Sequence, residues 1–276
     1  MVSTEPAELY LDLMKKILTR SGFESDYRSL HLRKASAGDL LLGPWLRLLR
    51  RRGFDIRRRV PVDPTVRAEG RDLPSEAETM VGLRRLDHLQ QCVLDVVQQE
   101  VSGDLIETGV WRGGASIFMR AALSAYGDAE RVVWVADSFA GLPKPNPEAY
   151  PHDQGDRHWT ARALAIPRRT VEDNFERYGL LDDRVRFLEG WFKDTLPVAP
   201  IENLAIIRLD GDMYQSTMGA LVALYPKLSI GGHLIVDDYG AIPACRKAVE
   251  DFREEQDISE DIEEVDWTGV SWKRLR

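Results

Sequence analysis

Four acids that follow two apolar runs are the residues of this sequence whose types and spacing best suit chemistry. Asp210 and Asp212 follow the run 204–209, and Asp237 and Asp238 follow the run 233–236. If both runs are strands of one parallel sheet, their ends share an edge, where carboxylates repel one another unless a cation holds them. Oxygen donors without a cysteine or histidine cluster favour a hard cation such as Mg²⁺ over zinc. The alternative is that single acids here only cap helices.

Two earlier apolar runs also end in acid, at Glu107 and Asp137. Glu107 is followed by Thr108-Gly109-Val-Trp-Arg-Gly113, and glycines at such a turn let a ligand approach the backbone and the amino end of the next helix. The spacing disfavours NAD and FAD, which use Gly-x-Gly-x-x-Gly. It resembles motif I of class I S-adenosylmethionine methyltransferases, and Asp137 is placed to accept hydrogen bonds from two ribose hydroxyls. A plain tight turn with a capping acid would explain either feature alone, but the two together favour a cofactor site.

A parallel α/β sheet is the element pattern that would position these acids. Strand-like runs at 105–109, 131–137, 185–190, 204–210 and 233–238 alternate with helical patterns. Helices are predicted at 9–18, 39–52, 83–97, 115–125, 216–228 and 243–255, and another begins at an N-cap Thr170 and closes at Gly179. Segments 262–267 and 270–275 flank Thr268-Gly269 and predict a terminal hairpin. Ligands of such sheets bind beyond the carboxyl ends of the strands.

Composition excludes several classes of protein. The 276 residues carry 37 Lys+Arg against 45 Asp+Glu, a net charge of −8 that argues against nucleic acid as a partner. The chain has no run of the length that a membrane span needs and no signal-peptide pattern, so we expect no membrane partner. Its two cysteines form neither a disulfide framework nor a zinc cluster. A cytoplasmic location is therefore expected.

The N-terminal region contains a basic cluster between Arg47 and Arg59, with seven arginines. A polyanion-binding patch is one interpretation, but only Phe54 interleaves with these arginines, and stacking platforms need several aromatic residues. We interpret the cluster instead as the solvated, or inter-subunit, face of an amphipathic helical arm.

Longer strings resemble one family. The sequence is similar to the macrocin O-methyltransferase family, which includes the mycinamicin and novobiocin sugar O-methyltransferases. The similarity runs from about Glu78 to the C-terminus, with a further match at 9–16. It is carried by Gly103-Asp-Leu-Ile-Glu-Thr-Gly-Val-Trp-Arg-Gly-Gly-Ala, Val133-Trp-Val-Ala-Asp-Ser-Phe, Val185-Arg-Phe-Leu-Glu-Gly-Trp-Phe-Lys-Asp-Thr, Leu209-Asp-Gly-Asp and Ile235-Val-Asp-Asp-Tyr.

The resemblance implies the fold and the activity. The implied fold is a class I S-adenosylmethionine methyltransferase, Rossmann-like, with a mostly parallel seven-stranded sheet and a C-terminal antiparallel hairpin. An N-terminal helical arm and lid would occupy 1–78 and the methyltransferase domain 79–276. The implied reaction transfers a methyl group from S-adenosyl-L-methionine, with Mg²⁺, to a sugar hydroxyl of an antibiotic-type glycoside or of its activated deoxysugar precursor. Relatives suggest a homodimer or a higher homo-oligomer.

The resemblance also implies roles for individual residues. Asp210, Asp237 and Asp238 match metal ligands, Asp212 matches an acid proposed as general base, and a segment that contains Met80 would fold over the cofactor. The implied cofactor-binding residues are Met80, Glu107, Thr108, Gly109, Gly113, Ser116, Asp137, Ser138, Trp191, Phe192 and Asp210.

Several alternatives stay open at this point. Asp212 and Asp210 are the first catalytic candidates, and His152 or His158 in the proline-rich segment after Asp137 could instead act as base or bind the acceptor. A catechol- or phenol-type O-methyltransferase would use the same fold and metal geometry. A non-catalytic cofactor-binding scaffold is a third interpretation, which the paired acids disfavour. Metal-dependent phosphoryl chemistry lacks a basic clamp at the first turn apart from Arg112.

Overall fold

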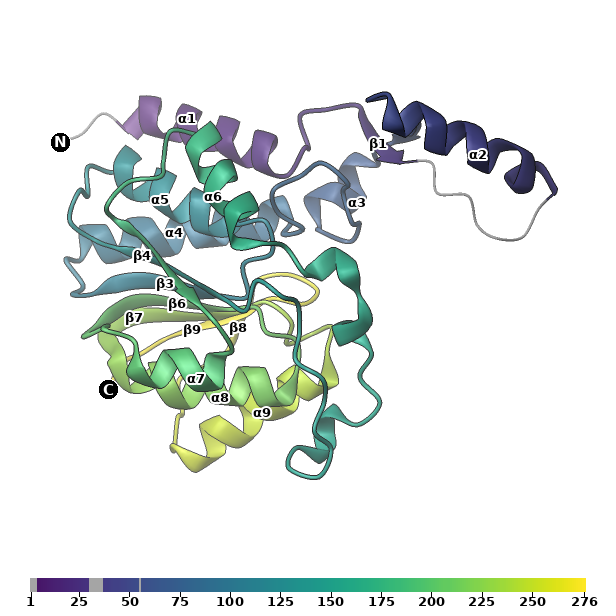
Figure 1. The fold of residues 1–276 in the computed structure, drawn as a ribbon. Coiled ribbons are helices and arrows are strands. Elements are labelled where there is room, and N and C mark those ends of the chain that lie inside the picture. Colours follow the sequence, from purple (N-terminus) through teal and green to yellow (C-terminus); the bar gives the residue numbers. More distant parts are fainter. Residues whose placement is uncertain (1–3, 30–36, 55) are drawn as a thin grey trace.

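A seven-stranded sheet lies at the centre of the computed structural model, which describes residues 4–29, 37–54 and 56–276 (Figure 1). The strand order is β5-β4-β3-β6-β7-β9-β8, in which the first five strands are parallel and β9 and β8 are antiparallel to their neighbours. This confirms the predicted sheet and terminal hairpin. The strands are β3 (Asp104–Thr108), β4 (Val133–Asp137), β5 (Val185–Glu189), β6 (Leu204–Leu209), β7 (Leu228–Val236), β8 (Glu263–Glu264) and β9 (Val270–Lys273).

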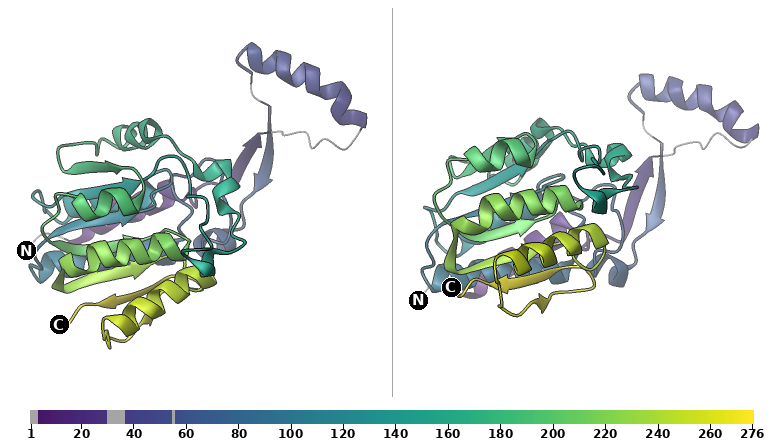
Figure 2. Two further views of the ribbon diagram at one scale, coloured as in Figure 1. Left: turned by 60° about the horizontal axis from the view of Figure 1, so that its bottom comes forward. Right: turned by 90° about the horizontal axis from the view of Figure 1, so that it is seen from below.

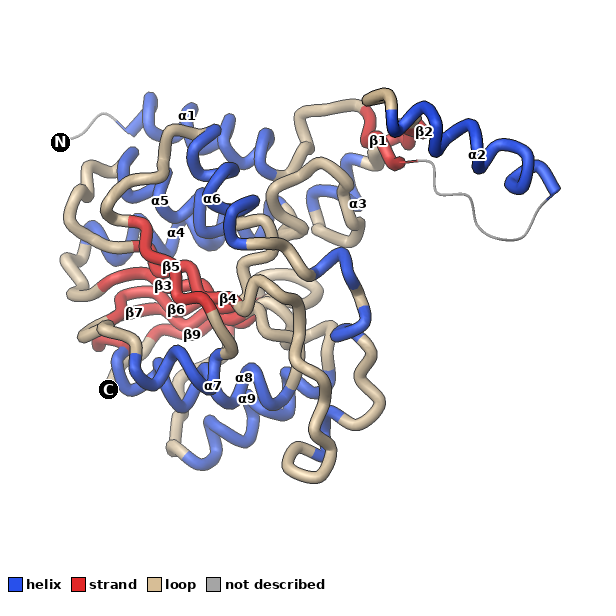
Figure 3. The backbone as a smooth tube through the Cα atoms, in the orientation of Figure 1, coloured by secondary structure: helices blue, strands red, loops and turns tan. Residues whose placement is uncertain are grey.

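Helices cover both faces of the sheet (Figures 1 and 3). Alternate residues of each strand point to opposite faces, so that Val133 packs into one core and Trp134 into the other. One face carries α1 (Thr4–Leu18), α4 (Leu83–Gln98), α5 (Gly114–Ala125) and α6 (Arg168–Arg177), and the other carries α7 (Phe192–Thr195), α8 (Tyr214–Leu224) and α9 (Pro243–Glu255).

Two predicted helix ends are wrong. The residue at the N-cap of α6 is Pro167, not Thr170, and its fixed φ of −60° already suits the start of a helix. The helix α8 stops at Leu224, because Pro226 has no N–H to continue the ladder. A short 3₁₀ turn, Tyr225–Lys227, leads directly into β7, which therefore starts at Leu228.

An arm projects from this body (Figures 1 and 2). It is an antiparallel ribbon of β1 (Ser25–Ser29) and β2 (Arg57–Pro61) with α2 (Ala37–Arg51) at its outer end, and α3 (Pro64–Ala68) leads back to the body. The arm was predicted as helical, and the ribbon was not foreseen because β2 lacks apolar alternation: Arg57, Arg58 and Arg59 are all exposed. The basic cluster is thus divided between α2 and β2, and its exposed β2 part agrees with the solvated interpretation.

The helix α1 belongs to the body and not to the arm. Leu11, Met14 and Leu18 are buried in the core that α4 and α5 share. The proposed domain boundary at residue 78 stays a prediction. Within the described ranges, no helix combines the length and the apolar character that crossing a bilayer would require.

Candidate active site

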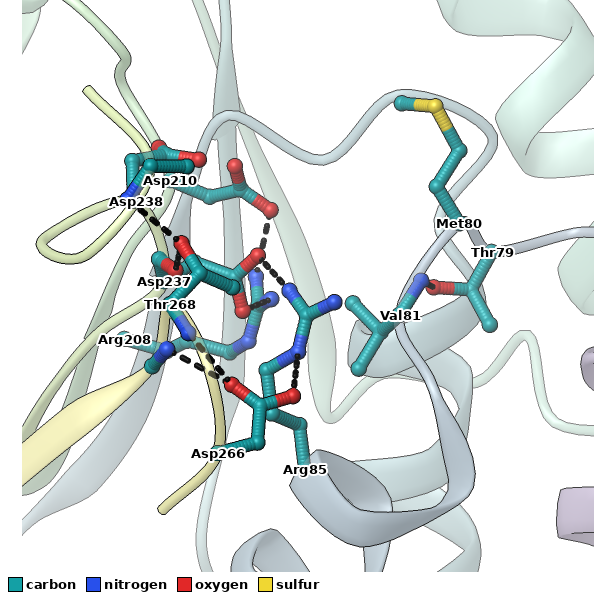
Figure 4. Close-up of polar contacts among 12 residues, drawn as sticks. Thr79, Met80, Val81, Arg85, Arg208, Asp210, Asp237, Asp238, Asp266 and Thr268 are labelled. Carbon is teal, nitrogen blue, oxygen red and sulfur yellow. Dashed lines mark hydrogen bonds and ion pairs between the residues drawn. The ribbon is translucent and has the colours of Figure 1, made fainter. Parts of the chain in front are cut away.

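Three of the predicted metal ligands meet at the carboxyl edge of the sheet. Asp210 follows β6, and Asp237 and Asp238 follow β7, so the two parallel strands end side by side. One oxygen from each acid lies within 4.8 Å of the others (Figure 4). An all-oxygen donor set of this size fits a hard divalent cation such as Mg²⁺. Asp212 is held beside them because its backbone N–H donates to Asp238 Oδ2 at 3.2 Å.

Two buried arginines, which were not predicted from the sequence, lie among these acids. From β6, Arg208 donates through Nη1 to Glu107 Oε1 at 2.6 Å and to Asp210 Oδ2 at 2.9 Å, and its Nη2 bonds Asp237. From α4, Arg85 bonds the other oxygen of Asp237, and its Nε donates to Asp266 Oδ2 at 3.0 Å. The signal for Arg208 was present in the sequence, since a charge inside an apolar strand needs buried partners of opposite sign.

The arginines offset only part of the negative charge. Burial raises the pKa of Glu107 to about 7 despite Arg208, and burial together with Asp237 raises the pKa of Asp210 to about 6. Burial and Asp210 raise the pKa of Asp212 to about 7. Burial works against the charge of Arg208, yet the acids around it, led by Asp237, raise its pKa above the ordinary value. A site whose acids resist ionisation favours a further cation.

A cavity of about 290 Å³ opens beside the acids. Most of the predicted cofactor residues line it, as does the candidate base Asp212. The connection from β4 to α6 supplies another part of the wall, which the sequence analysis did not assign residue by residue. The body contributes Met80, Gly109, Asp137, Ser138, Trp191, Phe192, Asp210 and Asp212, and the connection contributes Leu142, Pro143, Lys144, Asn146 and Leu164.

The turn between β3 and α5 forms one side of this cavity. Gly109 has a φ of 83°, and a Cβ there would lie 1.7 Å from the backbone oxygen of Asp210. Only glycine therefore allows the turn to lie so close to the end of β6. Asp137 fixes the same turn, because its carboxylate accepts from the N–H groups of Val110 and Phe139, each at 2.8 Å.

The side chain of Glu107 lies beneath the cavity. It is 2% exposed, accepts from Ser116 Oγ, and meets Arg208 on its other oxygen. Thr108 and Gly113 are likewise outside the residues that line the cavity. The four predicted cofactor residues that do not line the cavity are Glu107, Thr108, Gly113 and Ser116. They lie in or next to the turn between β3 and α5, and their direct contact with a cofactor stays a prediction.

Residues 79–81, just before α4, form a strap that brings Met80 to the cavity. Arg67 of α3, which is fully buried, donates through Nη2 to the carbonyl oxygen of Met80 at 2.7 Å. Thr79 Oγ1 accepts from the N–H of Val81 at 3.0 Å. Figure 4 shows this strap across the Arg85 guanidinium from the acids. The role of Arg67 was not predictable from the sequence, because no motif marks an arginine that binds carbonyl groups.

The two candidate histidines, His152 and His158, are not among the residues that line the cavity. His152 is exposed, and its ring stacks on Tyr214 at 5.1 Å between centroids. Its neighbour Asp153 holds the loop on α8 by accepting from the N–H groups of Tyr214 and Gln215 at 2.7 and 3.0 Å. His158 Nδ1 lies 2.6 Å from Asp156 Oδ2. Asp210 and Asp212 line the cavity and His152 does not, so the catalytic role of His152 stays a prediction.

Known proteins are similar in sequence to this chain over three quarters of its length or more. The profile of the macrocin-O-methyltransferase (TylF) family matches residues 7–274. An 8-demethyl-8-(2,3-dimethoxy-alpha-L-rhamnosyl)-tetracenomycin-C 4'-O-methyltransferase from Streptomyces olivaceus is 52% identical over 272 residues, which are 98% of this chain and 94% of that protein. A mycinamicin III 3''-O-methyltransferase from Micromonospora griseorubida is 52% identical over 211 residues, 75% of this chain and 83% of that protein.

A solved structure agrees with the sequence comparison. The structure of the O-methyltransferase NovP superposes with a TM-score of 0.84 at 44% identity, covering 98% of this chain and all of that chain. The fold is the class I S-adenosylmethionine methyltransferase fold, as predicted. By its sequence, its sheet order and its agreement with these relatives, the chain is an O-methyltransferase of the macrocin O-methyltransferase (TylF) family.

Proposed function

We propose that the protein methylates a sugar hydroxyl of a glycosylated natural product, or of its activated deoxysugar precursor, with S-adenosylmethionine as donor and Mg²⁺ bound by three aspartates. The observation that carries this proposal is that Asp210 belongs to both sites, because it lies in the cluster of three acids and also lines the cavity. Asp210, Asp237 and Asp238 gather their oxygens within 4.8 Å, and Gly109 and Asp137 line the space beside them. The names of two relatives support a sugar acceptor: one acts at the 4' position of a rhamnosyl-bearing tetracenomycin C, and the other at the 3'' position of mycinamicin III.

The cofactor would occupy the part of the cavity that the body lines. S-Adenosylmethionine would supply a methyl group on a sulfonium. The acceptor oxygen would attack the methyl carbon in line as the C–S bond breaks and S-adenosylhomocysteine leaves, so the main task of the protein is positioning. Asp137 would accept hydrogen bonds from the ribose hydroxyls with the lone pairs that Val110 and Phe139 leave open. Met80 from the strap and Trp191 after β5 would flank the cofactor and exclude water.

The metal would be held by Asp210, Asp237 and Asp238. A divalent cation held by these oxygens would lower the pKa of an acceptor hydroxyl and help to orient it. The structure supports this by the donor chemistry, and by arginines that occupy one side of Asp210 and both oxygens of Asp237 while leaving lone pairs on each carboxylate. Arg208 and Arg85 thus fix the positions of Asp210 and Asp237 through hydrogen bonds.

Asp212 is the proposed general base. It lines the cavity, and the bond from its N–H to Asp238 fixes its backbone beside the metal ligands. Its φ of 56° lies in the left-handed region, which aspartate adopts more readily than most residues. A positioned base of this kind contributes on the order of 10²–10⁴-fold to the rate.

We also propose that the enzyme acts in the cytoplasm as a homodimer or a higher homo-oligomer. The assembly is supported by the projecting arm, where Trp45 and Phe54 are 66% and 62% exposed. Large aromatic side chains on an amphipathic arm are typical of surfaces that are covered in an assembly.

Methyl transfer to a panel of acceptors tests the proposal. The purified protein, S-adenosylmethionine and Mg²⁺ are incubated with rhamnosyl and other deoxysugar glycosides, nucleotide-linked deoxysugars and catechols, with and without EDTA. We expect methylation of a sugar hydroxyl that EDTA abolishes and Mg²⁺ restores. Methylation of catechols alone would make the enzyme a catechol-type O-methyltransferase, and full activity in EDTA would contradict the metal site.

A further inference from the structure

One backbone position in the turn between β3 and α5 carries a side chain that its conformation disfavours. Residues 109, 111 and 113 all have positive φ angles, of 83°, 48° and 84°. Glycine occupies the first and the last, but the middle residue is Trp111. A bulky residue with positive φ is a real outlier, and such strain persists where surrounding contacts fix it, commonly at functional sites.

The side chain of Trp111 reaches across the cavity edge to the connection between β4 and α6. Its indole Nε1 donates to the carbonyl oxygen of Ala163 at 2.8 Å, within the 3₁₀ turn Arg162–Leu164. Trp111 and Leu164 both line the cavity. Arg112 stacks on the indole ring at 4.2 Å and is itself anchored on the carbonyl oxygens of Ser75 and Ala77.

The bond to Ala163 is distinctive within this part of the connection. Among the described residues, the other hydrogen bonds of 158–165 join neighbours in the loop, such as Ala161 N–H to His158 O at 2.8 Å and Leu164 N–H to Ala161 O at 2.9 Å. The earlier part of the connection has its own anchor, Asp153 on α8. Residues 158–165 therefore depend on the Trp111 side chain for a hydrogen bond to the body.

We propose that Trp111 is a positioning residue for the sugar acceptor, an inference that rests on the proposed function. Its indole N–H ties residues 162–164 to the turn on the cofactor side and so fixes the loop wall of the cavity. The strained backbone is retained because it aims the indole at Ala163 while the N–H of the adjacent Val110 bonds Asp137. Trp111 thereby sets the spacing between the β3–α5 turn, where the cofactor would bind, and residues 162–164, which would border the acceptor.

Trp111→Phe tests this tether, since it keeps an aromatic ring and removes the N–H. Trp267→Phe is a matched control: Trp267 Nε1 donates to Glu69 O at 2.8 Å and Arg71 stacks on its ring at 4.3 Å, but Trp267 is outside the residues that line the cavity. For Trp111→Phe we expect the acceptor KM to rise roughly fivefold, the factor of one ordinary net hydrogen bond, with kcat nearly unchanged. Amide hydrogen exchange of 158–166 should accelerate, and neither change should occur in the control.

Binding of S-adenosylhomocysteine, measured by calorimetry, shows whether the variant is folded and should remain near the wild-type affinity. The proposal is overturned if hydrogen exchange of 158–166 is the same in Trp111→Phe and wild type. It is also overturned if cofactor affinity falls as much as acceptor affinity, because Trp111 would then support the cofactor turn alone. Should the wild type methylate no sugar, the proposed function fails, and the exchange experiment still decides whether the tether exists. If Trp111→Phe does not fold, Trp111→Tyr is measured in its place with the same expectations.

Discussion

At the residue scale, the site is a balance between buried acids and two buried arginines. The acids were predictable from the sequence, because each follows an apolar run and parallel strands end at one edge. The sequence could show that Arg208 needs buried acidic partners, but not which acids they are, since pairing across strands depends on which strands are neighbours. Arg208 reaches Glu107 on β3 and Asp237 after β7 only because β6 lies between them. His152 and His158 were alternative candidates for the base for a related reason: the sequence alone does not tell whether a loop side chain faces the cavity.

Removing Arg208 should destabilise the protein severely. In Arg208→Met the acids Glu107 and Asp237 lose a buried counter-charge, which costs about 3–5 kcal/mol of the free energy of unfolding. The exposed Arg186→Met on β5 is the control and should change it by less than about 0.5 kcal/mol. Denaturant unfolding of both variants measures this. Equal effects would mean that Arg208 does not act as the counter-ion.

The raised pKa values of Glu107 and Asp212, both about 7, predict how stability depends on pH. Between their unfolded pKa values and pH 7 the folded state binds more protons than the unfolded state, so the free energy of unfolding falls as pH rises. In EDTA, we expect stability to decrease from about pH 5 to about pH 7, and saturating Mg²⁺ to reduce the decrease by favouring the ionised acids. Glu107→Gln should flatten the curve. Stability that rises across this range in EDTA would contradict the raised pKa values.

At the scale of elements, the regular pattern was predictable and the irregular parts were not. Helices 83–97 and 243–255 were found within one residue or so because their apolar spacing is regular. The β1–β2 ribbon was missed because two-stranded pairing outside a core leaves no apolar alternation to detect. The β3–α5 turn was predicted from its glycines, and the structure adds the reason for Gly109, its contact with the end of β6.

Gly109→Ala should therefore damage the cofactor site. The new Cβ would lie 1.7 Å from the Asp210 carbonyl oxygen, so the turn must move away from β6. Gly127→Ala is a matched control, because Gly127 has a similar φ of 79° with no atom within 4 Å of the added Cβ. We expect the affinity for S-adenosylhomocysteine to fall by more than about tenfold in Gly109→Ala only, while the control loses about 1 kcal/mol of stability from backbone strain. Equal affinities in calorimetry would show that the turn does not contact the cofactor.

At the scale of the whole molecule, the acidic composition argued against nucleic acid as a partner, and the family resemblance implied the overall architecture. What composition could not tell is how the N-terminal region divides: α1 packs in the core, whereas the ribbon and α2 project from it (Figure 2). The acids behind the net charge of −8 also fall into two groups: some cluster at the carboxyl edge of the sheet, and others are solvated.

The projecting arm predicts an assembly that depends on it. Trp45→Glu places a charge on the exposed apolar face of α2 and should shift the sedimentation of the protein from dimer or larger toward monomer. Ile230→Glu, on the exposed start of β7 at 67% exposure, is the control and should leave the mass unchanged. A wild-type protein that sediments as a monomer would contradict this prediction outright.

The central claim is that the three aspartates bind a divalent cation beside the cofactor. The most direct measurement is a calorimetric titration of Mg²⁺ into the protein saturated with S-adenosylhomocysteine, for the wild type, Asp238→Asn and the exposed control Asp261→Asn. We predict one Mg²⁺ per chain in the wild type and the control, and an affinity at least about tenfold lower in Asp238→Asn. Equal Mg²⁺ binding in all three proteins, or none in the wild type, would contradict the account.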